Sequence, residues 1–375
     1  MSGEGRLKSE RSPEMTGEIT SKADVLKNLY GKLKYSRIEK MRIVTGGEFE
    51  RDPYSMAKDI GGEFGAGKIV VRSSSSNEDG MNTSNAGHYE SVLGVDPGNP
   101  EEVMRAIREV LESYKCDLDD VTDEQVLIQT QVESISYSGV IFSRELKKNR
   151  PYYAITYDED STDAVTSGRG GKTVYILRNA HEDSLPEHWH ALIRAMRELE
   201  GVFSDYPIDV EFAVDEKNAV IIFQVRPLAA SIRAEKCSIS DEEIFAAADR
   251  ACQKYREIGD LLGEKNTILS DMAFWNPAEM IGENPHPLDY SLYREIITSS
   301  AWNQGLSYIG YKEVDGDLMY KLGNKPYISL RKSFLGLMPD DVDDRLEKKL
   351  LEYYNRKLIA DPTAHDKIEF EIAFS

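Results

Sequence analysis

Two short apolar segments near the middle of the chain carry polar side chains at alternate positions. Residues 208–214 and 220–227 each show the period-two pattern of a β-strand, and the polar segment 215–218 between them is typical of a hairpin connection. If the connection holds an even number of residues, antiparallel pairing places the alternate polar side chains of both strands on the same face. The hairpin would then have one polar face and one apolar face.

The polar face of this hairpin would bring together two carboxylates, an amide and a guanidinium. Asp209 and Glu211 lie on one side of the first strand, and Gln224 and Arg226 lie on one side of the second. Carboxylates suit Mg²⁺, and the arginine fork matches phosphate oxygens. The four residues therefore predict a metal–nucleotide site. A solvated sheet face with cross-strand charge pairs is an equally good interpretation of the hairpin alone.

Three further segments contain residue types that suit phosphate. Arg72 ends a predicted strand, and the serine, asparagine and glycine residues of 73–80 could donate to phosphate oxygens, although their composition favours a solvated loop. Residues 166–172 would either close over a phosphate chain or form a mobile hairpin tip. Residues 62–68 have the spacing of a Walker A loop, but they precede a strand, and Ile69 replaces the hydroxyl residue that would bind Mg²⁺. We therefore reject a P-loop.

The spacing of the histidines and cysteines does not support a metal or nucleophilic site. None of the six histidines has metal-ligand spacing or a neighbouring nucleophile, although His88 lies in the serine- and glycine-rich region and could approach a nucleotide. Cys116, Cys237 and Cys252 lack the spacing of a zinc or redox pair, and their odd number gives no disulfide framework. We expect reduced cysteines and a cytoplasmic location.

Periodicity and capping signals predict the elements that would position these residues. A helix over 22–34 carries Lys22 near its start, and a helix over 100–114 is marked by Asn99 as its N-cap. The other predicted elements are helices over 186–199 and from Ser240 onward, and strands over 68–72, 125–132, 139–143, 152–157 and 173–177. This mixture predicts an α+β fold.

Residues 238–375 are predicted to form a mainly helical linker or second domain. Within it, residues 274–294 are dense in aromatic residues, prolines and carboxylates, and they would either form a substrate pocket or pack between domains. Residues 366–375 alternate apolar and polar, which predicts a strand. This strand either joins an existing sheet or begins a further part of a longer polypeptide, in which case the second region is incomplete at its C-terminal end.

Length and charge restrict the class of protein. The chain of 375 residues is long enough for two or three domains, and its net charge of −20 opposes binding to nucleic acid and to anionic membranes. Its longest apolar runs fall short of the ~18 residues that a membrane helix needs. Residues 1–20 are polar, lack the apolar stretch of a signal peptide, and are predicted to be disordered.

The order of the signals over residues 21–232 is more specific than any one of them. Lys22 in an early helix is followed by the segments 71–74, 129–132 and 138–143, and then by Asp-x-Glu at 209–211 and Gln-x-Arg-Pro at 224–227. This order resembles the nucleotide-binding domain of the phosphoenolpyruvate synthase and pyruvate phosphate dikinase family, a two-lobed ATP-grasp-like fold.

The resemblance implies that ATP and Mg²⁺ bind between two lobes. Lys22 and Arg72 would contact the phosphates, and Arg226 would contact the transferred phosphates, so these three cations would be the catalytic residues. Glu211 and Gln224 would lie next to Mg²⁺. The implied nucleotide-binding residues are Lys22, Arg72, Asp209, Glu211, Gln224 and Arg226.

The same resemblance implies a dikinase-type phosphotransferase. Such enzymes cleave ATP to AMP and phosphate, and a histidine on a separate swivelling domain carries the β-phosphate to a small acceptor. The family's histidine lies in a Ser-His-x-Ala setting that is missing from this sequence, so the phosphohistidine domain would belong to a longer chain or to another subunit.

Three readings of the activity remain open. Residues 22–49 and 274–294 resemble the capsule-biosynthesis subgroup that includes L-glutamine kinase, in which the acceptor is the glutamine amide. The alternatives are phosphorylation of pyruvate, as in phosphoenolpyruvate synthase, and a non-catalytic nucleotide-binding module or scaffold.

Overall fold

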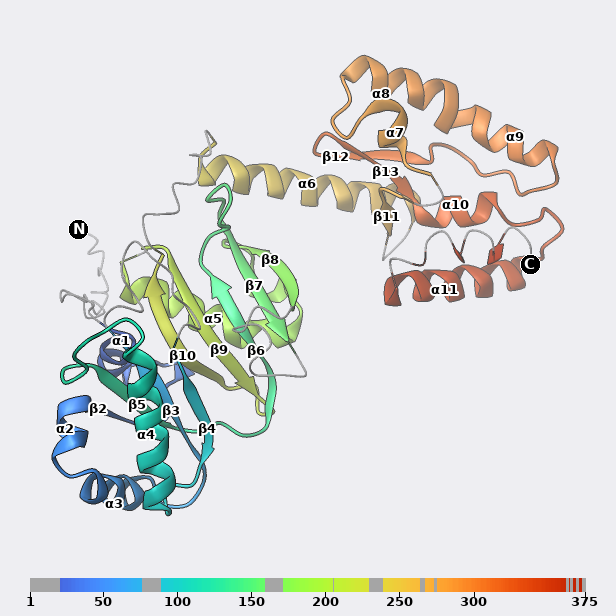
Figure 1. Ribbon diagram of the computed structural model, residues 1–375. Coiled ribbons are helices and arrows are strands. Elements are labelled where there is room, and N and C mark those ends of the chain that lie inside the picture. Colours follow the sequence, from blue (N-terminus) through green and yellow to red (C-terminus); the bar gives the residue numbers. More distant parts are fainter. Residues whose placement is uncertain are drawn as a thin grey trace, which may run out of the picture. The chain divides into compact units, whose positions relative to one another are not determined.

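The computed structural model describes residues 21–75, 89–158, 171–204, 206–228, 239–263, 267–272 and 275–361, together with 364, 367–368 and 371–372. Helices and strands occur together along the chain, which confirms the expected α+β class. The chain divides into two compact units, residues 1–241 and residues 242–375 (Figure 1). Within the described ranges, no helix combines the length and apolar character needed to cross a membrane.

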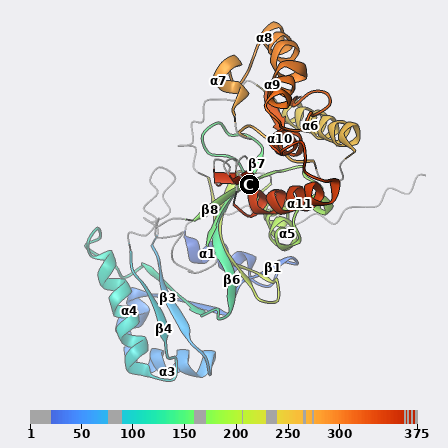
Figure 2. The same cartoon turned by 90° about the vertical axis from the view of Figure 1, so that its right-hand side faces the viewer.

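The smaller lobe of unit 1 is a four-stranded sheet with helices packed on it. Its elements are β2 Met41–Thr45, α2 Gly46–Arg51, α3 Pro53–Phe64, β3 Ile69–Ser74, β4 Ser91–Val95, α4 Pro100–Tyr114 and β5 Gln125–Thr130. The strand order is β2-β5-β3-β4, and all neighbouring strands are antiparallel. Apolar side chains of the sheet, α3 and α4 form a single core, and Figure 2 shows both helices beside β3 and β4.

Helix α4 shows how the local sequence determines an element of this lobe. The side chain of Asn99 accepts hydrogen bonds from the backbone N–H groups of Glu101 and Glu102, and Pro100 occupies the first turn. These contacts confirm the predicted start of the helix. The buried residues recur at helical spacing, as the periodicity of this segment predicts: Val103, Met104, Ala106, Ile107, Val110, Leu111 and Tyr114.

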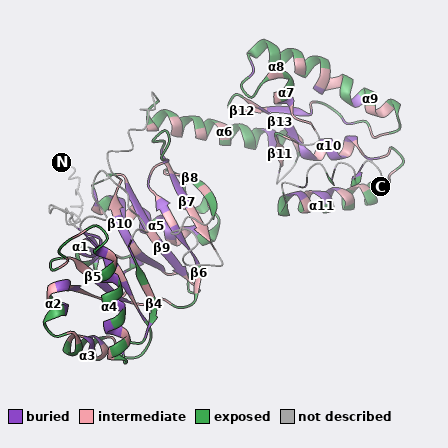
Figure 3. Ribbon diagram, viewed as in Figure 1, coloured by how far each residue is buried: buried purple, intermediate pink, exposed green. Residues whose placement is uncertain are grey.

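The larger lobe of unit 1 is a six-stranded sheet. Its elements are α1 Lys22–Leu29, β1 Ser36–Arg37, β6 Ile135–Phe142, β7 Tyr152–Asp158, β8 Lys172–Leu177, the 3₁₀ turn η1 Glu182–Ser184, α5 Glu187–Val202, β9 Ile208–Asp215 and β10 Val220–Pro227. The strand order is β1-β10-β9-β6-β7-β8, in which only β1 and β10 are parallel. One face of the sheet packs on α1 and α5, and its buried strand residues are purple in Figure 3.

Unit 2 contains a small sheet that the sequence analysis did not predict. Its elements are α6 Asp241–Leu262, β11 Leu269–Ser270, α7 Pro277–Ile281, α8 Pro287–Tyr293, the π-helix η2 Arg294–Ala301, α9 Trp302–Tyr308, β12 Met319–Leu322, β13 Lys325–Ser329, α10 Leu330–Gly336 and α11 Asp344–Ala360. The strand order is β11-β13-β12. Its core includes Met319, Ile328, Phe334 and Leu351, so the sheet packs with α10 and α11.

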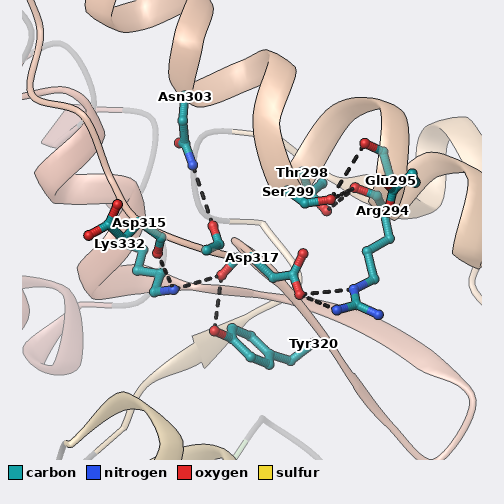
Figure 4. A network of polar contacts seen from close by, with 10 residues as sticks. Arg294, Glu295, Thr298, Ser299, Asn303, Asp315, Asp317, Tyr320 and Lys332 are labelled. Atoms are coloured by element: carbon teal, nitrogen blue, oxygen red, sulfur yellow. Dashed lines mark hydrogen bonds and ion pairs between the residues drawn. The ribbon is translucent and has the colours of Figure 1, made fainter.

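A polar network fixes the loop 314–317 that precedes β12 (Figure 4). Asn303, Lys332 and Tyr320 donate hydrogen bonds to backbone carbonyls of this loop over distances of 2.7 to 3.0 Å. Arg294 pairs with the carboxylate of the last loop residue, with Nε at 2.9 Å from Oδ2. The donors come from η2, α9, α10 and β12, so the loop links four elements of unit 2.

The serine segment that follows Arg72 does not begin as the solvated loop that its composition favours. Strand β3 continues through Ser74, and residues 73–75 are buried. The expectation is wrong for these residues because pairing with β5 extends to Ser74, which lies opposite Gln125. The residues 76–80, His88 and the segment 166–170 lie outside the described residues.

The strand expected over residues 366–375 is also wrong for the residues that are described. Residues 367–368 and 371–372 are helical, and both Ile368 and Ile372 are buried. Residues four apart lie on the same side of a helix, so an alternating pattern with this spacing also fits a helix.

Candidate functional site

The register of the β9–β10 hairpin decides which side chains share a face. Val214 pairs with Val220, and the residues 215–219 between them are odd in number, so the even connection that we assumed is wrong. In an unbroken ladder this register would put the polar residues of the two strands on opposite faces. The ladder shifts by one residue between Ile222 and Gln224, where Phe223 is the extra residue of a β-bulge.

The bulge restores the arrangement that the sequence pattern predicts. Beyond it, Gln224 lies opposite Glu211, and Arg226 lies opposite Asp209. The apolar residues of both strands face the core of the larger lobe; they include Ile208, Val210, Phe212, Val214, Ile222 and Val225. The four polar side chains therefore share the other face.

Asp209 and Arg226 form a close ion pair across the two strands. Nε of Arg226 lies 2.9 Å from Oδ1 and 2.7 Å from Oδ2 of Asp209. The Asp209 side chain is 8% exposed and that of Arg226 is 26% exposed. The pair holds the guanidinium at the partly open side of the site.

Arg72 connects the smaller lobe to this polar face. From β3, its Nη2 donates to Oε2 of Glu211 at 3.1 Å, and its Nη1 donates to the backbone carbonyl of Phe223 at 3.3 Å. The guanidinium carbon also lies 5.8 Å from the centre of the Phe223 ring. One arginine therefore contacts both strands of the hairpin.

Lys22 lies at the start of α1 and is only 6% exposed. The helix start is attached to the end of β3, because the backbone N–H of Ala23 donates to Oγ of Ser74 at 2.9 Å. Ser74 is held in turn by the hydroxyl of Tyr114, which accepts from the Ser74 N–H at 2.8 Å and donates to the carbonyl of Gln125 at 2.7 Å. Lys22 and Arg72 are thus positioned by the same strand.

The electrostatics of the site favour an ionised Glu211. Burial alone would raise the pKa of this carboxyl, but the charges of Lys22, Arg72 and Arg226, with the hydrogen bond from Arg72, hold the pKa below its usual range. Among the five charged residues named here, the three cations outnumber the carboxylates of Glu211 and Asp209, although the whole chain carries −20. A polyphosphate matches this local excess of positive charge.

The donor set also fits a phosphate-bound Mg²⁺. Glu211 is ionised, and its strand partner Gln224 contributes an amide on the same face. Within the described parts of the chain, no group of three or more His, Cys, Asp or Glu side chains could hold a metal ion. Mg²⁺ in nucleotide sites takes only one or two protein carboxylates and completes its shell with phosphates and water, so one carboxylate and one amide are sufficient.

Sequence reasoning missed Phe223 and the contacts by which Ser74 and Tyr114 hold the start of α1. A signal for Phe223 exists in the sequence, because the apolar run 220–223 breaks the alternation that the rest of the strand keeps. Ser74 is one of several adjacent serines, and Tyr114 fits an ordinary buried helix position. Their hydrogen bonds depend on pairing between segments that are distant in the sequence.

One segment of unit 1 is similar to a known family. Residues 48–164 match the pyruvate phosphate dikinase, AMP/ATP-binding domain family. The matched segment includes Arg72 and ends before β9. The match supports nucleotide binding by unit 1.

Solved structures align with part of this chain at low sequence identity and low TM-score. The dinucleotide-forming acetyl-coenzyme A synthetase 1 of Candidatus Korarchaeum cryptofilum is 15% identical with a TM-score of 0.37, and the alignment covers 56% of this chain and 93% of that chain. The D-alanine-D-alanine ligase of Helicobacter pylori is 14% identical with a TM-score of 0.33. That alignment covers 56% of this chain and 53% of the ligase, so this chain spans about half of the ligase's length. The comparison with curated proteins found no match.

Proposed function

We propose that unit 1 binds Mg·ATP on the polar face of the β9–β10 hairpin and forms the ATP site of a phosphotransferase. The observation that carries the proposal is the convergence of Arg72 from one sheet with Glu211 and Arg226 from the other. A surface hairpin with simple cross-strand charge pairs would not need a second cation from another lobe, nor a buried lysine beside it. The family match over residues 48–164 supports the same conclusion.

In this proposal each charged group has a separate task. The cations of Lys22, Arg72 and Arg226 hold the phosphate chain and offset the charge that develops on the transferring phosphoryl group. Glu211 and Gln224 would hold Mg²⁺, which would offset negative charge on the phosphates. The chemistry is therefore mainly electrostatic, and each desolvated cation contributes on the order of 10²–10³ to the rate.

The more specific part of the proposal is a dikinase reaction. The β-phosphate passes from ATP to a histidine of a separate domain or subunit and then to a small acceptor, while water takes up the γ-phosphate, so that the products from ATP are AMP and inorganic phosphate. The resemblance of residues 22–49 and 274–294 to L-glutamine kinase makes the glutamine amide the first acceptor to test, with pyruvate as the alternative.

The test is AMP formation from labelled ATP and Mg²⁺, with and without a phosphohistidine-domain fragment. We expect AMP and labelled histidine only when both proteins are present. Glu211→Ala and Arg226→Ala should remain folded, as judged by circular dichroism, and should form no AMP. Wild-type activity in either variant contradicts the assignment. Binding of Mg·ATP without AMP formation would instead indicate a nucleotide-binding module.

A further inference from the structure

The hairpin residue Phe223 contacts Arg72 in two different ways. Its backbone carbonyl accepts a hydrogen bond from Nη1 at 3.3 Å, and its ring lies 5.8 Å from the guanidinium carbon. The carbonyl can point out of the ladder because Phe223 is the extra residue of the bulge and has no partner residue on β9. One residue therefore offers two neutral groups to the same cation.

The position of Phe223 differs from that of the neighbouring apolar residues. Ile222 and Val225 belong to the buried core of the larger lobe, whereas Phe223 is only partly buried. A partly exposed phenylalanine beside an arginine contributes little to core packing. Its ring face and carbonyl instead restrict where the guanidinium can lie.

The type of contact matters for a phosphate ligand. Glu211 neutralises part of the charge of Arg72, whereas the carbonyl and ring of Phe223 are uncharged and leave that charge available. A guanidinium has five N–H donors, and Arg72 uses one to Glu211 and one to Phe223 among the described residues. The remaining donors can reach phosphate oxygens from a fixed position.

We propose that Phe223 is a positioning residue that holds Arg72 in the orientation that engages the phosphates of ATP. This inference rests on the proposed function of unit 1. It predicts that changes at Phe223 weaken the binding of phosphate groups and leave the binding of the nucleoside unchanged. A purely structural role, or contact of the ring with the base, would affect ATP and adenosine alike.

Three variants separate the ring from the carbonyl. Phe223→Leu keeps the bulge and its carbonyl but removes the ring, and Phe223→Tyr keeps all three. Deletion of Phe223 removes the extra residue, so that Ile222 and Gln224 become neighbours in a regular ladder that keeps Gln224 opposite Glu211 and Arg226 opposite Asp209. Phe64→Leu is the matched control, because Lys40 lies 5.4 Å from the ring of Phe64, away from the site.

The measurement is the dissociation constant of Mg·ATP and of adenosine for the full chain, by isothermal titration calorimetry. We expect Mg·ATP to bind about three- to tenfold more weakly to Phe223→Leu, as loss of a cation–π contact implies, and about 100-fold more weakly to the deletion variant. Adenosine affinity should not change. Phe223→Tyr and Phe64→Leu should match the wild type.

The outcomes distinguish this inference from the proposed function. Wild-type protein that binds neither Mg·ATP nor adenosine would contradict the proposed function itself. Wild-type binding of Mg·ATP with unchanged affinity in Phe223→Leu and in the deletion variant would overturn only the role of Phe223. Equal losses of affinity for Mg·ATP and for adenosine in these variants would also overturn the role of Phe223, because they would indicate that its ring contacts the adenine base.

Discussion

At the scale of single residues, the Asp209–Arg226 pair allows its contribution to folding stability to be distinguished from its proposed role in ATP binding. Asp209 is almost completely buried, so removal of Arg226 takes an ion-pair partner away from a poorly solvated carboxylate. Arg226 is partly exposed, and solvent screening reduces the cost. The pair therefore makes only a modest contribution to folding, whereas in the proposed site the guanidinium binds the phosphates.

A double substitution tests this separation. Arg226→Gln alone should lower stability by about 1–2 kcal/mol, because the buried carboxylate of Asp209 loses its ion pair with Arg226. It should also abolish Mg·ATP binding, because the proposed phosphate-binding guanidinium is gone. The double variant Asp209→Asn, Arg226→Gln should recover most of the stability, since neither side chain is then charged. It should still fail to bind Mg·ATP. The measurements are urea unfolding and calorimetric titration. Recovery of binding in the double variant would show that the guanidinium does not contact the ligand.

Glu211 gives a prediction about pH. Its pKa is lower in the folded chain than its ordinary value of about 4.3, so the ionised form favours folding. This contribution is complete above pH ~4.3 and is lost as the pH falls through the lower folded pKa. We therefore expect the melting temperatures of wild type and Glu211→Gln to differ most near neutral pH and to converge as the pH falls below about 4. A gap that widens on acidification would contradict the charge assignment.

At the scale of secondary structure elements, Gly139 of β6 is required by strand pairing. A Cβ atom at this position would lie 2.1 Å from the backbone oxygen of Thr156 on β7 and 2.8 Å from Cα of Tyr157. Backbone atoms cannot move away as a flexible side chain could. The close approach of β6 and β7 therefore excludes any larger residue, although the sequence shows only an isolated glycine in a strand.

Two alanine substitutions test the close approach. Gly139→Ala should destabilise unit 1 by several times RT, on the order of 2–4 kcal/mol, because the strands must separate. Gly201→Ala is the control, since a Cβ there meets no atom within 4 Å. This second substitution should be neutral or stabilising by up to about 1 kcal/mol, because alanine favours the helix α5. Equal effects in thermal melts would contradict the strand geometry.

Elements with a regular local pattern could be predicted from the sequence, whereas their pairing could not. The capped, amphipathic α4 was predicted because its apolar periodicity and its N-cap are encoded within one segment. In the small sheet of unit 2, β11 consists of two residues and its pairing with β13 is long-range, so it has no local signal. The hairpin of β12 and β13 is local, and its two-residue connection 323–324 is a sequence signal that was overlooked. The C-terminal strand was wrong because alternation over a short segment also fits helical spacing.

In the candidate site, too, local patterns could be predicted from the sequence, whereas contacts between distant segments could not. Alternation identified Asp209, Glu211, Gln224 and Arg226, and the structure places them on one face. The structural cause differs from the one that we assumed, because the β-bulge at Phe223, and not an even number of residues in the connection, places the polar residues of the two strands on the same face. Contacts such as that of Tyr114 with Ser74 join different elements, so no local pattern could have predicted them.

At the scale of the whole molecule, the proposed ATP site lies entirely within unit 1. All six predicted nucleotide-binding residues fall within residues 22–226, and unit 2 has its own core around its small sheet. Ligand binding should therefore stabilise the two units to different extents.

Hydrogen exchange with mass spectrometry tests this difference. Addition of Mg·ATP should slow exchange in β3, β9 and β10, because the ligand binds side chains of these strands. Exchange in α10 and α11 should not change. Adenosine at saturating concentration is the control and should protect β3 less, since it lacks the phosphates that Arg72 would bind. Protection confined to unit 2 would place the nucleotide elsewhere.

The odd number of residues in the turn and the bulge of the β9–β10 hairpin have a consequence for molecular evolution. A single-residue insertion or deletion in the turn reverses the orientation of every side chain beyond it, unless a second such event at Phe223 compensates. Related sequences should therefore vary the spacing between the two acidic positions and the Gln-x-Arg motif in steps of two, or lose one residue at the bulge when the turn changes by one. In related proteins, an odd change in the length of the turn is therefore expected together with an odd change at the bulge.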